Sequence, residues 1–369
     1  MSRTFTANKI VTPGGEISQG WVSVDNGTIT AIGEGTPTSA TTHLDGTMLP
    51  GFVDIHCHGG GGHSFDDPAG AAAAAEFHLQ HGTTSILASL VSAPIHDQLR
   101  LLSALTRLVT DDVIAGVHLE GPFLSHIKCG AQNPAVLVDP SPEAVSQLLE
   151  FAGSSLRYIT IAPELPGALE AIERLTAAGV VVALGHSDAT AAEAVAGRQA
   201  GATAVTHLFN AMRTVHHRDN GLADVALIDP LLSTEVIPDG IHVAQMAMQL
   251  AATTKQHRLV AVTDAISAAG MPDGDYRLGG LDVTCADGAA RLTGTNTLAG
   301  STLTMDRAFA YLHTVMGLSL TAAAHATATE PARVLGLHHV GTIEVGKQAD
   351  FVVWNDGLRE VIKKGLPIR

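Results

Sequence analysis

Eight apolar segments that resemble buried strands recur along the middle of this chain. They are residues 51–59, 83–91, 113–121, 156–164, 180–188, 202–210, 231–240 and 259–267. Most are separated by helix-like stretches, such as residues 69–80, 166–179 and 189–201. Apolar runs that alternate with helices are typical of parallel strands buried on both faces. Eight such strands predict an α/β protein built as a (β/α)8 TIM-type barrel.

An open, doubly wound sheet is the competing architecture. Its dinucleotide-binding form needs a Gly-x-Gly-x-x-Gly turn after the first strand and an acidic residue further on. The first strand-like segment of this chain ends in HCHGGGG instead. We therefore rank the open sheet second.

The two ends of the chain read as short strands and turns. WVSVDNGTITAIG alternates apolar and polar residues around Asn26-Gly27, which predicts a hairpin. VGTIEVGKQADFVVWNDG, residues 340–357, predicts strand, turn and strand. Neither end is long enough to bury a core alone. We therefore expect residues 1–48 and 337–369 to form one small β-sandwich domain beside a barrel of residues 49–336.

Composition excludes several kinds of partner. A net charge of −15 disfavours nucleic acid and anionic membrane surfaces. The chain has no apolar run near the ~18 residues of a membrane helix, and its first residues lack the apolar core of a signal peptide. Its three cysteines are widely spaced without a Cys-x-x-Cys pair, which favours a reducing cytoplasm over a disulfide scaffold.

Polar residues gather where the apolar segments end. They are His56, His58, Glu120, Glu164, His186, Asp188, His207, Asn210, Asp239 and Asp264. In a (β/α)8 barrel these ends share one rim, which is where such enzymes place their chemistry. A chance distribution would scatter histidines over loops and helices. The shared placement predicts a metal site on this rim.

The types of ligand atom on this rim limit which metal ions can bind. In an extended segment, His56 and His58 project from one face and Cys57 from the other, so two imidazoles can converge on one ion. Hydrogen bonding or chance is the alternative for a lone His-x-His. Imidazole and carboxylate donors without thiolate suit a divalent ion, first Zn²⁺ and also Fe²⁺, Mn²⁺ or Co²⁺. A carboxylate can bridge, so one or two ions fit.

Asp264 is the candidate catalytic acid/base, because a carboxylate beside the metal can take a proton from water and pass it to a leaving group. The alternative for Asp264 is a residue that only orients a ligand histidine.

The motifs PGFVDIHCHG, HLEGPF, GHSDA, THLFNAM and VTDA resemble those of the amidohydrolase superfamily and, within it, the N-acetylglucosamine-6-phosphate deacetylases. The resemblance covers nearly the whole chain, including the closing GTIEVGKQADFVVW. Many relatives bridge their metals with a carboxylated lysine on the fourth strand. LRYITIAPE has no lysine here, and Glu120 on the third strand resembles its replacement.

The resemblance implies roles for individual residues. Glu120, His186 and His207 match the principal metal ligands, and His56 and His58 match a pair that only some members keep. Asp264 matches the catalytic acid/base. The matching substrate contacts are Ala131, Asn210, Ala211, His242, Leu298, Ala299 and Gly300.

Three further residues near the implied substrate site have roles that the motifs above do not cover. Gln132 stands where many members have a substrate-binding histidine, since this chain reads GAQNP rather than GAHNP. Arg218 matches an arginine that binds the sugar phosphate and reaches the neighbouring subunit's site, which implies a homodimer. Cys129 lies in the same loop as Gln132, and we favour a bystander over a reactive thiol.

The predicted function is hydrolysis of N-acetyl-D-glucosamine 6-phosphate to glucosamine 6-phosphate and acetate, in amino-sugar catabolism and cell-wall sugar recycling. Gln132 keeps open a deacetylase of another N-acyl amino sugar phosphate. A cyclic-amide or N-acyl-amino-acid hydrolase is a further alternative, whose site would not need Arg218. A non-catalytic barrel would be expected to have lost metal ligands, and all are present.

Overall fold

The computed structural model describes residues 2–37, 41–153 and 155–368. The chain forms two compact units. The first holds Met1–Asp54, Glu76–Ser85 and Thr304–Arg369, and the second holds Ile55–Ala75 and Ile86–Leu303. The domain boundaries expected from the sequence, at residues 48 and 337, stay a prediction.

An eight-stranded parallel sheet forms a nearly closed barrel, so the predicted (β/α)8 architecture is confirmed. The strands follow one another in chain order around the sheet, and each predicted apolar segment contains one of them. They are β5 (Phe52–Asp54), β8 (Thr83–Leu90), β9 (Gly116–Glu120), β10 (Leu156–Ile161), β11 (Val181–Leu184), β12 (Ala204–Val205), β13 (Ser233–Val236) and β14 (Leu259–Ala261).

Beyond the ends of β5 and β14, the chain continues to pair. The backbone N–H of Asp264 donates to the carbonyl of His56 at 2.8 Å, and that of His58 donates to the carbonyl of Ala265 at 2.8 Å. Two residues that matter for the site, His56 and Asp264, are thereby held next to each other by backbone hydrogen bonds.

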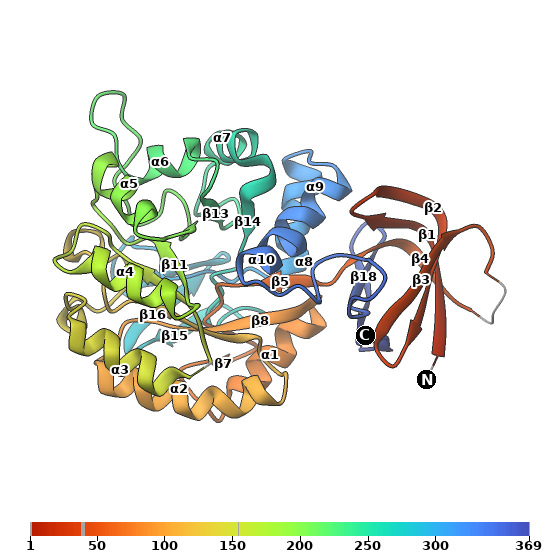
Figure 1. The fold of residues 1–369 in the computed structure, drawn as a ribbon, viewed down its shortest axis with the longest axis horizontal. Coiled ribbons are helices and arrows are strands. Elements are labelled where there is room, and N and C mark those ends of the chain that lie inside the picture. The colour runs from red at the N-terminus through yellow and green to blue at the C-terminus, as the bar shows by residue number, and fades with distance from the viewer. Residues whose placement is uncertain (1, 38–40, 154, 369) are drawn as a thin grey trace. The chain divides into compact units, whose positions relative to one another are not determined.

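Helices cover the outside of the strands, as Figure 1 shows for α2 to α7. They are α1 (Ala71–Gln80), α2 (Ile95–Thr110), α3 (Pro142–Ala152), α4 (Ala168–Ala177), α5 (Ala191–Gln199), α6 (Leu222–Ile228) and α7 (Gln245–Lys255). Local chemistry explains the start of α5, where Thr190 and Glu193 form a reciprocal capping box. In the described part of the chain, no helix combines the length and the apolar character needed to cross a bilayer.

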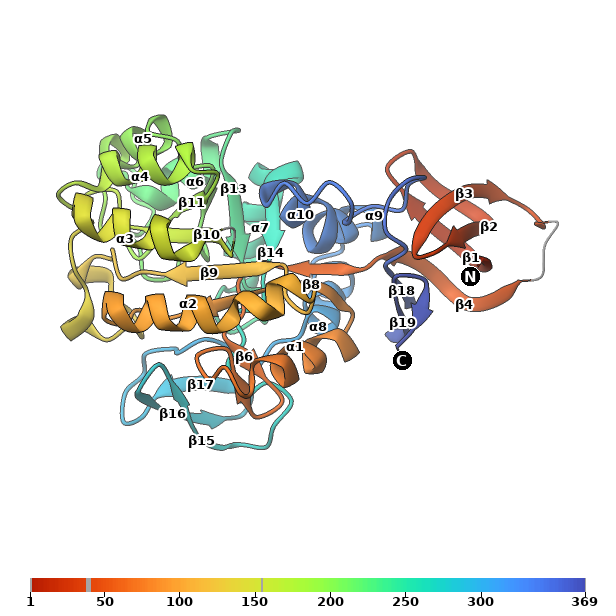
Figure 2. The ribbon, with the colours of Figure 1, turned by 60° about the horizontal axis from the view of Figure 1, so that its bottom comes forward.

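A three-stranded antiparallel sheet follows β14 and lies at the bottom of the view in Figure 2. It contains β15 (Gly274–Leu278), β16 (Leu281–Ala286) and β17 (Ala289–Leu292). Apolar side chains that include Val283, Cys285 and Ala290 pack with Ile266 and Ala299 in one cluster. The insertion therefore belongs to the packed body of the second unit. A second small hairpin pairs β6 (Gly59–Gly60) with β7 (His63–Ser64).

The first unit contains a seven-stranded sheet built from both chain ends, in the order β20-β19-β18-β4-β1-β2-β3. Its strands are β1 (Ser2–Thr12), β2 (Gly15–Asp25), β3 (Thr28–Glu34), β4 (Thr42–Pro50), β18 (Phe351–Trp354), β19 (Leu358–Lys363) and β20 (Leu366–Pro367). The predicted hairpin at Asn26-Gly27 joins β2 to β3. Fully buried Phe5, Met48 and Phe351 pack in its core.

The remaining helices of the first unit run from α8 to α10. They are α8 (Met305–Ala310), α9 (Leu320–Ala324) and α10 (Glu330–Val334). Residues Tyr311–Val315 and His325–Thr329 form π-helical turns directly after α8 and α9.

The prediction of a first strand at the start of residues 340–357 is wrong. Gly341 and Gly346 have φ angles of 85° and 90°, a left-handed conformation that interrupts an extended chain. The N–H of Lys347 closes a turn onto the carbonyl of Glu344 at 3.2 Å. Ile343 is nevertheless buried in the core, which explains the apolar pattern that suggested a strand.

We predict that Gly82→Ala destabilises the first unit more than Gly346→Ala does. Both glycines are left-handed, at φ 88° and 90°. A Cβ at Gly82 would lie 2.9 Å from carbon atoms of Phe52 and Val352, whereas nothing lies within 4 Å at Gly346. Gly346→Ala should cost about 1–2 kcal/mol, the usual penalty of a left-handed residue. Gly82→Ala should add overpacking of about 1–3 kcal/mol.

Urea unfolding followed by tryptophan fluorescence measures this difference, because both tryptophans of the chain, Trp21 and Trp354, belong to the first unit. Equal destabilisation by the two substitutions would show that the crowding at Gly82 relaxes at no cost.

Candidate metal centre and active site

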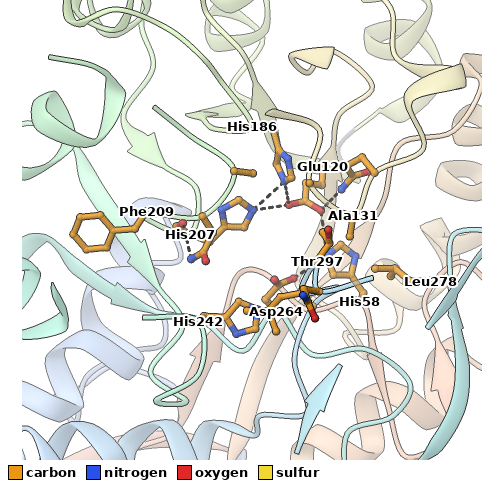
Figure 3. Close-up of a pocket in the computed structure, with 17 residues that line it drawn as sticks. His58, Glu120, Ala131, His186, His207, Phe209, His242, Asp264, Leu278 and Thr297 are labelled. Carbon is orange, nitrogen blue, oxygen red and sulfur yellow. Dashed lines mark hydrogen bonds and ion pairs between the residues drawn. The ribbon is translucent and has the colours of Figure 1, made fainter. Parts of the chain in front are cut away.

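Glu120, the last residue of β9, lies at the centre of a buried polar cluster (Figure 3). Its Oε1 is 3.0 Å from Nε2 of His186 and 3.1 Å from Nε2 of His207. The two imidazole nitrogens are themselves 3.0 Å apart. Three side chains at the ends of β9, β11 and β12 thus point at one location.

His56 and His58 approach the same carboxylate from the other side. Their Nε2 atoms are 3.2 Å apart, and each lies 3.4 Å from an oxygen of Glu120. Although β5 ends at Asp54, the alternation expected of an extended segment persists. The Sγ of buried Cys57 is directed to the carbonyl of Gly59, at 3.5 Å.

Asp264 completes the cluster from the segment after β14. Its Oδ1 is 3.2 Å from Nε2 of His58 and 3.4 Å from Nε2 of His56. Asp264 is buried, yet it lines the cavity described below. It therefore has access both to the histidines and to a bound molecule.

The backbone is bent where these residues leave their strands. His186, His207 and Asp264 have φ angles of 46°, 24° and 50°. For residues other than glycine these conformations are uncommon and cost on the order of 1–3 kcal/mol each. Strain of this kind after β11, β12 and β14 indicates a site whose geometry is held against local preference.

Charges in the cluster are strongly coupled. Burial alone would raise the pKa of Glu120, but His56 and His186 hold it well below its usual range. Burial would lower the pKa of His58, but hydrogen bonds with Asp264 and Glu120 raise it to about 9. The pKa of Asp264 is lowered in the same way, against burial, by His56 and His58. The two buried carboxylates, Glu120 and Asp264, are therefore stabilised in their ionised form by positive charge at this location.

A divalent cation can supply this positive charge. Two ligand atoms that are about 2.0–2.1 Å from one tetrahedral ion lie roughly 3.3–3.4 Å apart, close to the separations found here. The ligand atoms form two groups, His56, His58 and Glu120, and Glu120, His186 and His207. Glu120 belongs to both groups, so its carboxylate would contribute to either one or two ions.

A cavity of ≈ 320 Å³ opens beside the cluster, large enough for a small sugar derivative. The predicted site residues that line it are His58, Glu120, Ala131, Gln132, His186, His207, Asn210, Ala211, His242, Asp264, Leu298 and Gly300. Gly130, Phe209, Leu278, Asn296 and Thr297 also line it and were missed. The THLFNAM motif could have indicated Phe209, and Gly130 lies beside the predicted Ala131. Leu278, Asn296 and Thr297 come from the β15–β17 insertion and its following loop.

Three predicted residues do not line the cavity. His56 is fully buried. Ala299 is also fully buried, and its backbone N–H donates to the carbonyl of Ala290. Arg218 is exposed on the loop that precedes α6. Nearby Asp219 pairs with Arg213, at 3.2 Å between Oδ1 and Nη1. Cys129 is half-buried in the loop that carries Gln132.

Gln132 is fixed at both ends of its amide. Its Oε1 accepts from the backbone N–H of Ser92 at 2.8 Å, so its Nε2 faces Glu120 Oε2 at 2.6 Å. This orientation leaves one N–H of the amide group for another acceptor. The glutamine therefore holds the Glu120 carboxylate as well as lining the cavity.

His242 is positioned in a similar way by Asp239. The ring Nδ1 lies 2.6 Å from Asp239 Oδ2. Burial would raise the pKa of Asp239, but the hydrogen bond from His242 keeps it lowered. An ionised Asp239 accepts from Nδ1–H, so Nε2 is the ring atom available to a molecule in the cavity.

The family model for the amidohydrolase family matches residues 47–367. The chain belongs to the amidohydrolase family. It is 40% identical to an N-acetyl-D-glucosamine-6-phosphate deacetylase from Mycobacterium smegmatis. A variant of that protein has been solved with N-acetyl-D-glucosamine 6-phosphate, and the match covers 99% of both chains at a TM-score of 0.96.

Curated relatives carry similar names. An N-acetylglucosamine-6-phosphate deacetylase from Danio rerio is 37% identical over 84% of this chain and 81% of its own length. An N-acetylgalactosamine-6-phosphate deacetylase from Escherichia coli O157:H7 is 35% identical over 97% of this chain and 96% of its own length. The relatives thus share deacetylation of a phosphorylated N-acetyl hexosamine, and differ in the sugar.

Proposed function

We propose that this chain is a metal-dependent deacetylase that hydrolyses N-acetyl-D-glucosamine 6-phosphate to D-glucosamine 6-phosphate and acetate, in amino-sugar catabolism and cell-wall sugar recycling. The observation that carries the proposal is the convergence of Glu120, His186, His207 and Asp264 on one cavity. This arrangement occurs in a chain whose relatives, matched over most of their length, are named for this reaction.

Glu120, His186 and His207 would hold the essential divalent ion, and His56 and His58 would hold a second ion with Glu120. We infer zinc, because imidazole and carboxylate donors suit it well. When bound, a divalent ion supplies Lewis acidity: it polarises an amide carbonyl and makes water a stronger acid.

Asp264 would move the proton. Its lowered pKa keeps the carboxylate ionised, so it can accept a proton from the attacking water. The water oxygen forms a bond to the acetyl carbon, and the C–N bond then breaks. Asp264 returns the proton to the departing amine nitrogen, which leaves acetate and the amino sugar.

The cavity wall would hold the sugar. Asn210, Ala211, His242, Leu298 and Gly300 face the cavity, and Ala131 and Gln132 border it from the loop before α3. Ala299 would act by shaping the backbone of its loop, since its side chain is fully buried. The Nε2 of His242 is suited to a hydroxyl or carbonyl of the substrate.

Arg218 would bind the 6-phosphate of a neighbouring subunit's substrate, which requires a homodimer. Its exposure outside the cavity of its own chain supports action in trans. A planar guanidinium can contact two phosphate oxygens, which offsets the acidic character of the chain.

We also propose a cytoplasmic location. No disulfide joins Cys57, Cys129 and Cys285, all of which lie in the described part of the chain.

We predict that Glu120→Gln abolishes activity and removes bound metal, because Glu120 contributes to both groups of ligands. His56→Ala should remove at most one ion per subunit and leave measurable turnover. Elemental analysis and acetate release on the same preparation test this ranking. Equal metal loss and equal inactivation in the two variants would contradict it.

Asp264→Asn retains the shape of the side chain but cannot accept a proton. Turnover should fall by roughly 10²–10⁴-fold, while metal content and substrate binding persist. The measurement is single-turnover kinetics together with titration of substrate into the inactive variant. Near-normal turnover would assign proton transfer to another group.

Arg218→Ala should weaken use of the phosphorylated substrate by a few kcal/mol, on the order of 2–5 if the ion pair is desolvated. It should barely change the slow reaction of unphosphorylated N-acetylglucosamine. Comparing kcat/KM for the two sugars separates a phosphate contact from general damage, and an equal loss on both would exclude the phosphate role. N-acetylgalactosamine 6-phosphate in the same assay tests the alternative sugar.

Mixed dimers test whether Arg218 acts in trans. Combining Arg218→Ala with Asp264→Asn subunits creates, in the trans arrangement, one site with both groups intact. Activity should therefore reappear after subunit exchange. No recovery, with exchange verified by differently tagged subunits, would place Arg218 in its own subunit's site.

A further inference from the structure

A second buried carboxylate, Glu235 on β13, lies behind the metal centre and has no part in the mechanism above. Its Oε1 accepts from the hydroxyl of Tyr158 at 2.6 Å. Its Oε2 is 3.0 Å from Nδ1 of His56 and accepts from the backbone N–H of His207 at 3.2 Å. Glu235 is 1% exposed and does not line the cavity, so its contacts are to the protein rather than to substrate.

The contact with Glu235 determines how the His56 ring can act. A carboxylate only accepts hydrogen bonds, so Nδ1 of His56 must carry the proton that it donates to Oε2. The other nitrogen, Nε2, then presents its lone pair toward Glu120 and Asp264, each 3.4 Å away. This is the tautomer that a ligand to a divalent ion requires.

Among the histidines of the cluster, His56 is the one whose outer nitrogen meets a carboxylate. The Nδ1 atoms of His58 and His186 lie 3.1 Å from the backbone carbonyls of Ser89 and Lys128. A carboxylate makes a ligand imidazole more basic than a carbonyl does, and it fixes the ring more firmly. The outer nitrogen of His56 therefore has a different kind of hydrogen-bond partner from those of His58 and His186.

Tyr158 and His118 hold this arrangement in place. Burial, followed by the charge of Glu235, raises the pKa of Tyr158 well above its usual value, so the hydroxyl stays a donor. The ring of His118 contacts both His56 and Tyr158 edge to face, with centroids 4.6 and 4.9 Å apart. The side chain of His118 is anchored in turn by Ser89 and Thr160.

We propose that Glu235, supported by Tyr158, is a positioning residue that holds His56 in the orientation and tautomer needed to bind the second ion. The proposal rests on the metal role proposed for His56. It assigns to β13 a part in metal binding although no residue of that strand lines the cavity.

The test measures metal affinity rather than activity. Zn²⁺ is titrated against a chromophoric chelator into full-length protein carrying Glu235→Leu, which removes the acceptor. The more weakly bound ion should lose roughly 10–100-fold in affinity, while the tighter ion stays. Glu235→Gln, which keeps a neutral acceptor, should lose less.

Thr234→Val is the matched control. Thr234 neighbours Glu235 on β13, is fully buried, and donates to the carbonyl of Ala226 rather than to the cluster. Its loss should lower the thermal midpoint without changing either affinity. If Glu235→Leu does not fold, Tyr158→Phe keeps the carboxylate and should give a smaller loss in the same direction.

A double-mutant cycle with His56→Ala decides the route of the effect. If Glu235 acts through His56, then Glu235→Leu should change no affinity further once His56 is gone. Additive losses would overturn the proposal and assign Glu235 to the backbone of His207. Unchanged affinity in Glu235→Leu alone would also overturn it. Full metal binding by His56→Ala alone would instead overturn the ligand role of His56, and with it this proposal.

Discussion

The buried carboxylate of Glu120 is the constraint on which the site depends. An ionised group this far from water is tolerated only when its oxygens are engaged by donors or cations. Here Oε1 faces His186 and His207, and Oε2 faces Gln132 and His58. The segments that carry these partners therefore lie around the end of β9, and their side chains line the cavity.

The barrel makes this convergence possible, because parallel strands that follow one another in the sheet place their carboxyl ends on one rim. It does not by itself aim the side chains. His186, His207 and Asp264 each adopt a left-handed backbone directly after short strands. The packed core of the barrel stabilises a bend that the residues would avoid in isolation.

Much of this fold was predictable, because buried parallel strands leave continuous apolar runs, and all eight runs contain a strand. The residues with polar side chains at the ends of those runs were identified for the same reason. Glu235 and Tyr158 were not, because they lie within strands and point inward, where a single polar residue looks like a local irregularity. The start of residues 340–357 was wrongly predicted as a strand because buried Ile343 imitates a strand pattern.

Glutamine at position 132 changes which side chains of the site can contact the substrate. A histidine at this position could carry a charge toward the substrate, whereas the glutamine amide is held between Ser92 and Glu120. Only one of its N–H groups remains for a ligand, and it is neutral. In the proposed binding mode, recognition of the sugar then relies more on the opposite wall of the cavity. There, Asp239 holds His242 with Nε2 available, so in the proposed site that ring can contact the substrate without serving as a metal ligand.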